Sequence, residues 1–181
     1  MADSNPLPTG KEITFTMSSR TTAPPEAVYD VLADVGGHLD WAGSRGHKKF
    51  RLTGVQADAA PAQKGSEWTS TGIAPDGTFT DRSIVTDAAR PSRFEFTTQA
   101  HVAFRKGGEG DWTVLNRYDI EPDGTGSRVV YTQTVTRANE MGPMKMMLIP
   151  VVGSLMKGMA KGLAKPAMGN LAAVAEERAK R

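Results

Sequence analysis

The sequence predicts an α+β fold in which a curved antiparallel sheet of about six or seven strands surrounds one long C-terminal helix. Two observations predict this fold. From residue 11 to about residue 136, short segments that alternate apolar and polar residues are separated by Gly- and Pro-containing turns, as in strands joined by hairpins. From residue 141 onward, apolar residues recur instead at the spacing of an amphipathic helix.

Composition restricts the class of protein. The chain has 181 residues, of which 39% are hydrophobic and 23% charged, and this fits one globular domain. There is no cysteine, so disulfides, thiolate metal sites and cysteine nucleophiles are excluded. A formal net charge of +2 gives no indication of a nucleic-acid partner. We find no signal peptide and no apolar run as long as a membrane span, so a cytoplasmic protein is expected.

The N-terminal part of the chain is predicted to contain a tail, one strand and two short helices. Residues 1–10 are polar and include two prolines, so we expect a disordered tail before a single domain over residues 11–181. Residues 11–22 alternate apolar and polar side chains, which predicts a half-buried strand. The sequence Pro-Pro-Glu at residues 24–26 favours the start of a helix. A second helical turn is expected at residues 38–41.

Further strands follow, joined by hairpins, so that pairing is antiparallel throughout. Pro75-Asp76-Gly77 predicts a tight hairpin in which the glycine takes a positive φ. Residues 106–110 and 122–126 predict two more hairpins. The strands are predicted over residues 48–58, 67–72, 78–87, 93–104, 111–121 and 128–136.

The last helix carries a continuous apolar stripe that is expected to face the sheet. Pro166 lies inside the helical pattern and predicts a kink near residues 164–165, or two collinear segments. Pro150 indicates that residues 144–150 form a separate lead-in. The many methionines could wall an adaptable pocket or simply fill the core. The stripe consists of Val152, Leu155, Met156, Met159, Leu163, Ala167, Leu171 and Val174.

A basic stripe runs along the same helix, because Lys157, Lys161 and Lys165 recur every four residues. These lysines are either the solvated back of the helix or a surface for transient contact with an anionic membrane.

Three stretches of the sequence combine turn and packing signals of a known kind. They are TTAPPEAVYDVLADV at residues 21–35, followed by Trp41; DAARPSRFEF at residues 87–96; and YDIEPDGTGSRVVYTQTV at residues 118–135. Together with the long final helix, these stretches resemble the START-domain and birch-pollen-allergen superfamily (SRPBCC), which has the helix-grip fold. Within the superfamily the chain is most similar to the polyketide cyclase/dehydrase and lipid-transport group, over residues 11–180. The resemblance implies an apolar cavity between sheet and helix that holds lipids, sterols or polyketides. It does not imply catalysis.

On this fold, the inward-facing residues of the later strands and of the last helix are expected to line the ligand cavity. Arg82 could contact a ligand carboxylate or enolate if Ile84 faces inward, or is solvated if Val85 does. We expect no metal and no cofactor, because the histidines are isolated from one another and from carboxylates at ligand spacing. The expected ligand-binding residues are Trp41, Phe94, Phe96, Trp112, Asn116, Tyr118, Tyr131, Met156, Met159 and Leu163.

The histidines carry no clear catalytic pattern. His38 and Asp40, beside Trp41, could form a proton-transfer pair at the cavity mouth or cap a helix at the surface. His101 is expected on the outer face of its strand because Phe94 and Phe96 face inward.

Three hypotheses of function remain open from the sequence. The first is a non-catalytic protein that binds or carries a small hydrophobic molecule, and the chain is more consistent with this than with an enzyme. The second is a polyketide cyclase or aromatase-like enzyme that uses polar groups of the pocket. The third is an interaction module, such as a chaperone or stress co-regulator, with an exposed apolar patch. We expect a monomer or a homodimer without a nucleic-acid partner.

Overall fold

The computed structural model of the chain describes residues 12–43, 45, 48–57, 60–138 and 150–181, without the side chains of residues 150–156, 159 and 160. The predicted tail over residues 1–10 and the lead-in before Pro150 lie outside the described residues. The elements in chain order are β1 (Ile13–Thr21), α1 (Pro25–Ala33), η1 (Val35–Gly37), η2 (Leu39–Gly43), β2 (Arg51–Ala57), β3 (Glu67–Ala74), β4 (Gly77–Ala89), β5 (Arg93–Phe104), β6 (Glu109–Asp123), β7 (Gly126–Ala138) and α2 (Pro150–Ala179).

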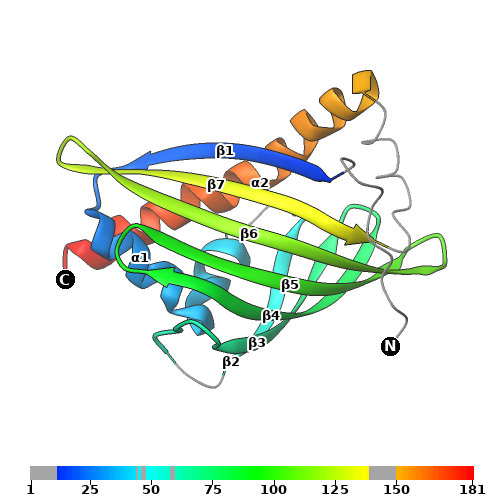
Figure 1. The fold of residues 1–181 in the computed structure, drawn as a ribbon, viewed down its shortest axis with the longest axis horizontal. Coiled ribbons are helices and arrows are strands. Elements are labelled where there is room, and N and C mark those ends of the chain that lie inside the picture. The colour runs from blue at the N-terminus through cyan, green and yellow to red at the C-terminus, as the bar shows by residue number, and fades with distance from the viewer. Residues whose placement is uncertain (1–11, 44, 46–47, 58–59, 139–149) are drawn as a thin grey trace.

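The strands form one seven-stranded antiparallel sheet in the order β1-β7-β6-β5-β4-β3-β2. Figure 1 shows the curved sheet with α2 crossing it, while α1 lies under one end of the strands beside the C-terminal part of α2. The predicted α+β helix-grip architecture is therefore confirmed. Each strand joins the next by a hairpin, except that β1 and β2 lie at opposite edges and are separated by the short helices.

The hairpin between β3 and β4 corrects one sequence prediction. Gly77 is the first residue of β4 and pairs with Ala74, and its φ is not positive. A Cβ at this position would instead collide with the backbone carbonyl of Ala103 on β5. Glycine is therefore needed here for close approach of two strands, whereas Gly124 in the β6–β7 hairpin does have a positive φ of 63°.

The two faces of the sheet differ in character because side chains alternate along each strand. Threonines of the two neighbouring strands β1 and β7 hydrogen-bond across the outer face, Thr14 to Thr134 at 3.0 Å and Thr16 to Thr132 at 3.1 Å. The inner face carries the aromatic side chains, and these pack against α1, η2 and the C-terminal half of α2. This core includes Phe15, Val28, Leu32, Trp41, Trp68, Phe94, Tyr118, Tyr131, Met168 and Leu171.

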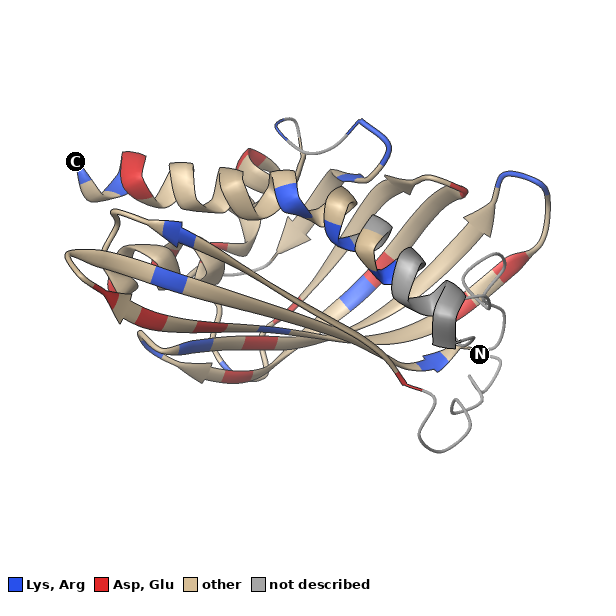
Figure 2. Cartoon of the chain, turned by 90° about the horizontal axis from the view of Figure 1, so that it is seen from above, with Lys and Arg blue, Asp and Glu red and all other residues tan. Residues whose placement is uncertain are grey.

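Helix α2 is continuous from Pro150 to Ala179, with Pro166 inside it. The alternative of two collinear segments is therefore wrong, and Pro150 begins the helix, where a missing backbone N–H costs nothing. Figure 2 shows that the helix axis changes direction about midway. None of the described helices combines the length and the apolar character that crossing a bilayer requires.

The C-terminal half of α2 is fixed to the rest of the molecule. Glu176 accepts hydrogen bonds from the Thr21 hydroxyl and the Thr22 N–H, both at 2.9 Å. Asn170 donates to the backbone carbonyl of Trp41 at 3.2 Å. The residues of this half that are buried are Met168, Leu171, Ala172, Val174 and Ala175.

Candidate functional site

Aromatic side chains form a continuous wall on the inner face of the sheet. The antiparallel register places Phe94, Tyr118 and Tyr131 in one row across β5, β6 and β7. Tyr118 stacks on Tyr131 with ring centroids 4.6 Å apart, and Phe96 packs edge-on against Trp68 at 4.9 Å. Such geometries are the favourable ones for aromatic pairs. The wall is therefore held in place by its own ring contacts.

Trp41 closes this wall from the side of the short helices. Its ring lies 6.4 Å from Tyr118 and 5.0 Å from the imidazole of His38. The indole Nε1 is buried and has no hydrogen-bond acceptor among the described residues. A buried donor without a partner is costly, so a ligand acceptor that reached this N–H by displacing the atoms that cover it would be bound favourably.

A row of hydrogen-bonded polar groups crosses the same inner face. The Asn116 carbonyl accepts from the Tyr131 hydroxyl at 2.7 Å and from the Gln133 amide at 3.1 Å. The Asn116 amide donates to the Thr98 hydroxyl at 3.2 Å, and Thr98 shares a 2.8 Å hydrogen bond with Ser83. The row extends over β7, β6, β5 and β4, and it supplies oriented dipoles inside an otherwise apolar interior.

The tyrosines of the site remain neutral at physiological pH. Burial raises the pKa of Tyr118 and, still more clearly, that of Tyr131. Neither phenol can therefore act as an anionic base, and both serve as hydroxyl groups that donate and accept hydrogen bonds.

Asp81 is a functional candidate that sequence reasoning missed. It lies on β4 opposite Ser70 of β3 and Ala100 of β5, and it accepts a hydrogen bond from the Ser70 hydroxyl. Burial raises the pKa of this carboxyl, and the bond from Ser70 offsets only part of that effect. Among the strand residues that the structure describes, Asp81 is the one carboxyl on the inner face; the others lie on the outer face or at strand ends.

The placement of Arg82 follows from the same alternation and corrects a prediction. Val85 and Ser83 face inward and are 1% and 2% exposed, whereas Ile84 is 40% exposed. Arg82 therefore lies outside, where its Nε donates to Glu67 at 2.9 Å across the β3–β4 pair. It cannot contact a ligand under α2, and the alternative in which Arg82 is solvated holds.

The suggested proton-transfer pair of His38 and Asp40 is also wrong. His38 is buried, its Nε2–H donates to the Leu32 carbonyl at 2.8 Å, and its ring packs against Trp41. Burial lowers the pKa of His38 to about 4, so the ring is a neutral core residue and not a surface cap. Asp40 is exposed. His101 lies outside, as expected, 2.8 Å from Asp111.

Much of the predicted site is brought together at the inner face. Phe94, Asn116, Tyr118, Tyr131 and Trp41 are buried there, whereas Phe96, Trp112, Gln133 and Asp81 remain half-exposed. Leu163 on α2 is likewise half-buried, while the side chains of Met156 and Met159 lie outside the described part of the chain. Solvent therefore reaches the part of the inner face that lies beyond the anchored half of α2.

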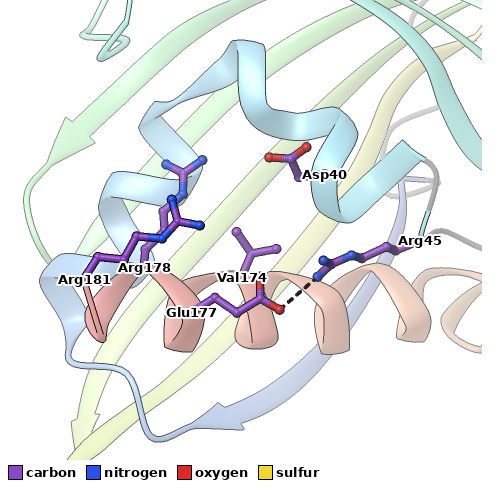
Figure 3. Close-up of a pocket in the computed structure, with 6 residues that line it drawn as sticks. All are labelled: Asp40, Arg45, Val174, Glu177, Arg178 and Arg181. Carbon is purple, nitrogen blue, oxygen red and sulfur yellow. Dashed lines mark hydrogen bonds and ion pairs between the residues drawn. The ribbon is translucent and has the colours of Figure 1, made fainter.

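A hollow at the surface lies between the C-terminal part of α2 and the segment of the short helices, as Figure 3 shows. It has a volume of about 690 Å³ and is lined by Asp40, Arg45, Val174, Glu177, Arg178 and Arg181. Arg45 pairs with Glu177 at 3.3 Å, and Arg178 pairs with Asp34 of α1's C-terminal end at 2.6 Å. Because these ion pairs join α2 to the short helices, we assign the hollow a structural role. The described residues contain no group of carboxylates and histidines that could hold a metal ion.

The open antiparallel sheet, its aromatic inner face and the long C-terminal helix across it define the helix-grip class of proteins. The chain belongs to the polyketide cyclase / dehydrase and lipid transport family, which its sequence matches over residues 12–176. Membership indicates a hydrophobic-ligand-binding or cyclase-like domain and confirms the resemblance found in the sequence.

Solved structures agree with this assignment at the level of the fold. Protein CV1439 from Chromobacterium violaceum is 16% identical, with 91% of this chain and 97% of that chain covered at a TM-score of 0.60. A protein from Arthrobacter aurescens is 15% identical, with 96% and 91% covered at a TM-score of 0.61. Ara h 8.0201 is 14% identical, with 88% and 97% covered at a TM-score of 0.54. Among curated proteins, no match was found.

Proposed function

We propose that the chain binds a small hydrophobic molecule, such as a lipid, sterol or polyketide, between the inner face of the sheet and α2. The observation that carries the proposal is an aromatic inner face on which Phe96 and Trp112 stay half-exposed, with a fixed polar row beside them. Ligand sites of small molecules are mostly apolar, with a few polar groups that orient the ligand. The carboxyl of Asp81 supplies one such group, and the Trp41 indole N–H, which has no acceptor among the described residues, would supply a second where ligand binding uncovers it.

A titration with Nile red, a neutral fluorescent probe, tests this proposal. Phe96→Ala should weaken binding roughly tenfold, equivalent to about 1.4 kcal/mol, because it removes a half-exposed ring from the centre of the wall. Ile84→Ala is the matched control, since Ile84 is an apolar residue exposed on the outer face of β4. Equal affinity of the wild type and Phe96→Ala would place the probe elsewhere. Native mass spectrometry of the freshly purified protein would show which molecule copurifies.

Asp81 favours a second candidate function, a cyclase or dehydratase-like enzyme. Burial raises the pKa of the Asp81 carboxyl, which makes it a better proton donor than an ordinary surface aspartate, and loss of water after ring closure of a poly-β-ketone requires such a donor. Asp81→Asn should abolish turnover of a poly-β-ketone thioester analogue and retain affinity for Nile red. The fold should be at least as stable, because the change removes a charge that is partly withdrawn from water. Full turnover in Asp81→Asn would exclude this role.

The interaction-module hypothesis has the least support. The large apolar residues that are exposed in the described part of the chain are Phe50, at 39%, and Ile84, at 40%. Phe50 packs near the inner residue Phe79, with ring centroids 6.2 Å apart, whereas Ile84 lies on the outer face. They do not form one apolar patch of the kind that marks a protein interface.

A further inference from the structure

A crevice between the edge strand β1 and α2 lies outside the site described above. Its volume is about 270 Å³, and Met17, Met168, Lys161, Lys165, Gly162 and Gly169 are among its lining residues. This is slightly below the roughly 300 Å³ at which small-molecule pockets begin. The crevice can therefore hold part of a ligand, such as a head group and the first carbons of a chain.

The crevice exists because of two features of the elements that border it. β1 is the edge of the sheet, so no strand covers the side that faces α2. Gly162 and Gly169 leave open space on the helix, since a Cβ at either position would meet no atom within 4 Å. The floor is apolar and continuous with the core, because Met168 is buried and Met17 packs against the core cluster.

The rim of the crevice is basic, and the described residues that line it include no acidic one. Lys161 and Lys165 are exposed, and neither forms an ion pair with a carboxylate of the described residues. The sequence of α2 contains no Asp or Glu before Glu176, and β1 contains none. Figure 2 shows the basic residues along the middle of α2, with acidic residues only near its C-terminal end. Two uncompensated ammonium groups above an apolar floor favour a ligand with an anionic end.

We propose that this crevice binds the carboxylate end of a single-chain amphiphile of the fatty-acid type. The carboxylate lies between Lys161 and Lys165, and the adjoining methylenes contact Met17 and Met168. This proposal rests on the proposed function only in that both ligands are hydrophobic. The crevice is a different site on the protein from the inner face of the sheet. A bilayer surface fits less well, because an interfacial helix exposes its apolar face, whereas Met168 is 4% exposed.

Calorimetric titration with monomeric dodecanoate tests the charge requirement. Lys161→Glu and Lys165→Glu should each weaken dodecanoate binding at least about fivefold, since an exposed ion pair is worth up to about this factor and reversal adds repulsion. Lys64→Glu is the matched control, because it changes the net charge equally at an exposed loop between β2 and β3. Dodecanol, with the same chain and no charge, should bind the wild type more weakly than dodecanoate.

A pair of glycine variants tests the place of binding. Gly162→Leu fills the crevice, whereas Gly158→Leu adds the same side chain one turn away, at a glycine that does not line it. Both should fold at least as well as the wild type, because leucine favours a helix more than glycine does. We expect Gly162→Leu to abolish dodecanoate binding, Gly158→Leu to retain it, and both to keep the Nile red affinity of the wild type.

Three results would overturn the proposal. These are unchanged dodecanoate affinity in Lys161→Glu and Lys165→Glu, equal binding of dodecanol and dodecanoate, and binding to phosphatidylglycerol vesicles without binding of monomeric dodecanoate. The last result would assign the lysines to a membrane contact. If the wild type failed to bind Nile red but bound dodecanoate with the expected variant effects, the proposed function would fail and the crevice would stand.

Discussion

At the scale of single residues, most polar side chains of the inner face hydrogen-bond to one another. Asn116 satisfies Tyr131, Gln133 and Thr98 at distances of 2.7 to 3.2 Å, which fixes the orientation of all four side chains. Within the part of the chain that the structure describes, the Trp41 indole N–H has no acceptor. A ligand is therefore recognised mainly by its shape and apolar surface, with few directional contacts.

His38 makes the stability of the fold depend on pH. Burial lowers its pKa to about 4 from an ordinary value of 6.5. Above pH 6.5 the imidazole is neutral in both states, so its full contribution to stability is present. As the pH falls towards 4, only the unfolded state binds the proton, and the free energy of unfolding decreases.

The expected loss from this histidine is about 2 kcal/mol between about pH 7.5 and about pH 5. Urea unfolding of the wild type and of His38→Phe at both pH values measures it. The variant leaves the Leu32 carbonyl unsatisfied at every pH and lowers stability throughout, but its decrease between the two pH values should be smaller by that amount. An identical decrease in both proteins would show that His38 titrates normally in the folded state.

At the scale of elements, α2 consists of two halves with different tasks. The residues of α2 described as buried lie between Met168 and Ala175, and the hydrogen bonds of Asn170 and Glu176 lie in the same half. Before Pro166 the described side chains are half-buried or exposed. A proline removes one backbone hydrogen bond at the junction, so the first half is less firmly coupled to the anchored half.

Two alanine substitutions separate these tasks. Leu171→Ala should destabilise the protein by about 2–5 kcal/mol, because Leu171 is fully buried and the substitution leaves a cavity. Leu163→Ala should cost less than about 1 kcal/mol, since Leu163 is only half-buried, but should weaken Nile red binding. Thermal unfolding and the probe titration measure the two effects. Equal destabilisation by both variants would contradict the division of α2 into an anchor and a cover.

The elements themselves could be largely predicted from the sequence, because period-two alternation and turn residues act locally. The predicted strand over residues 93–104 matches β5. The strand predicted over residues 111–121 is β6, which the structure extends to Glu109–Asp123. Strand ends were missed by a few residues because pairing with a neighbour, and not local preference, decides where a strand stops. Gly77 is a second example, because the need for glycine there comes from the backbone of Ala103 on β5, which the local sequence does not reveal.

The site was predicted less completely, because it depends on which of the two alternating sets of side chains on each strand faces inward. Asn116 and Tyr118 on β6 and Tyr131 on β7 were placed correctly on the inner face, since both strands show a clear apolar face. On β4 the sequence allowed either parity, and choosing Val85 as an inward residue would have placed Asp81 inside together with it. His38 could not be placed from sequence, because the bonds that bury its ring come from Leu32 and the two tryptophans.

At the scale of the whole molecule, the sheet and α2 depend on each other. The aromatic row of Phe94, Tyr118 and Tyr131 is buried at 0%, 5% and 7% exposure, and α1, η2 and the second half of α2 together cover it. An open sheet cannot close on itself to shield such a face from water, so it needs a covering helix.

Removal of residues 150–181 should therefore prevent cooperative folding, since the inner aromatic face would meet water and lose the bonds that Thr21 and Thr22 make to Glu176. Thermal unfolding monitored by tryptophan fluorescence and by near-ultraviolet circular dichroism measures this, and the full chain with Leu163→Ala serves as a folded reference. Adding a peptide of residues 150–181 to the truncated chain should restore the folded signal, because the missing contacts are non-covalent. A truncated chain that melts cooperatively without the peptide would show that α2 is an appendage of a self-sufficient sheet.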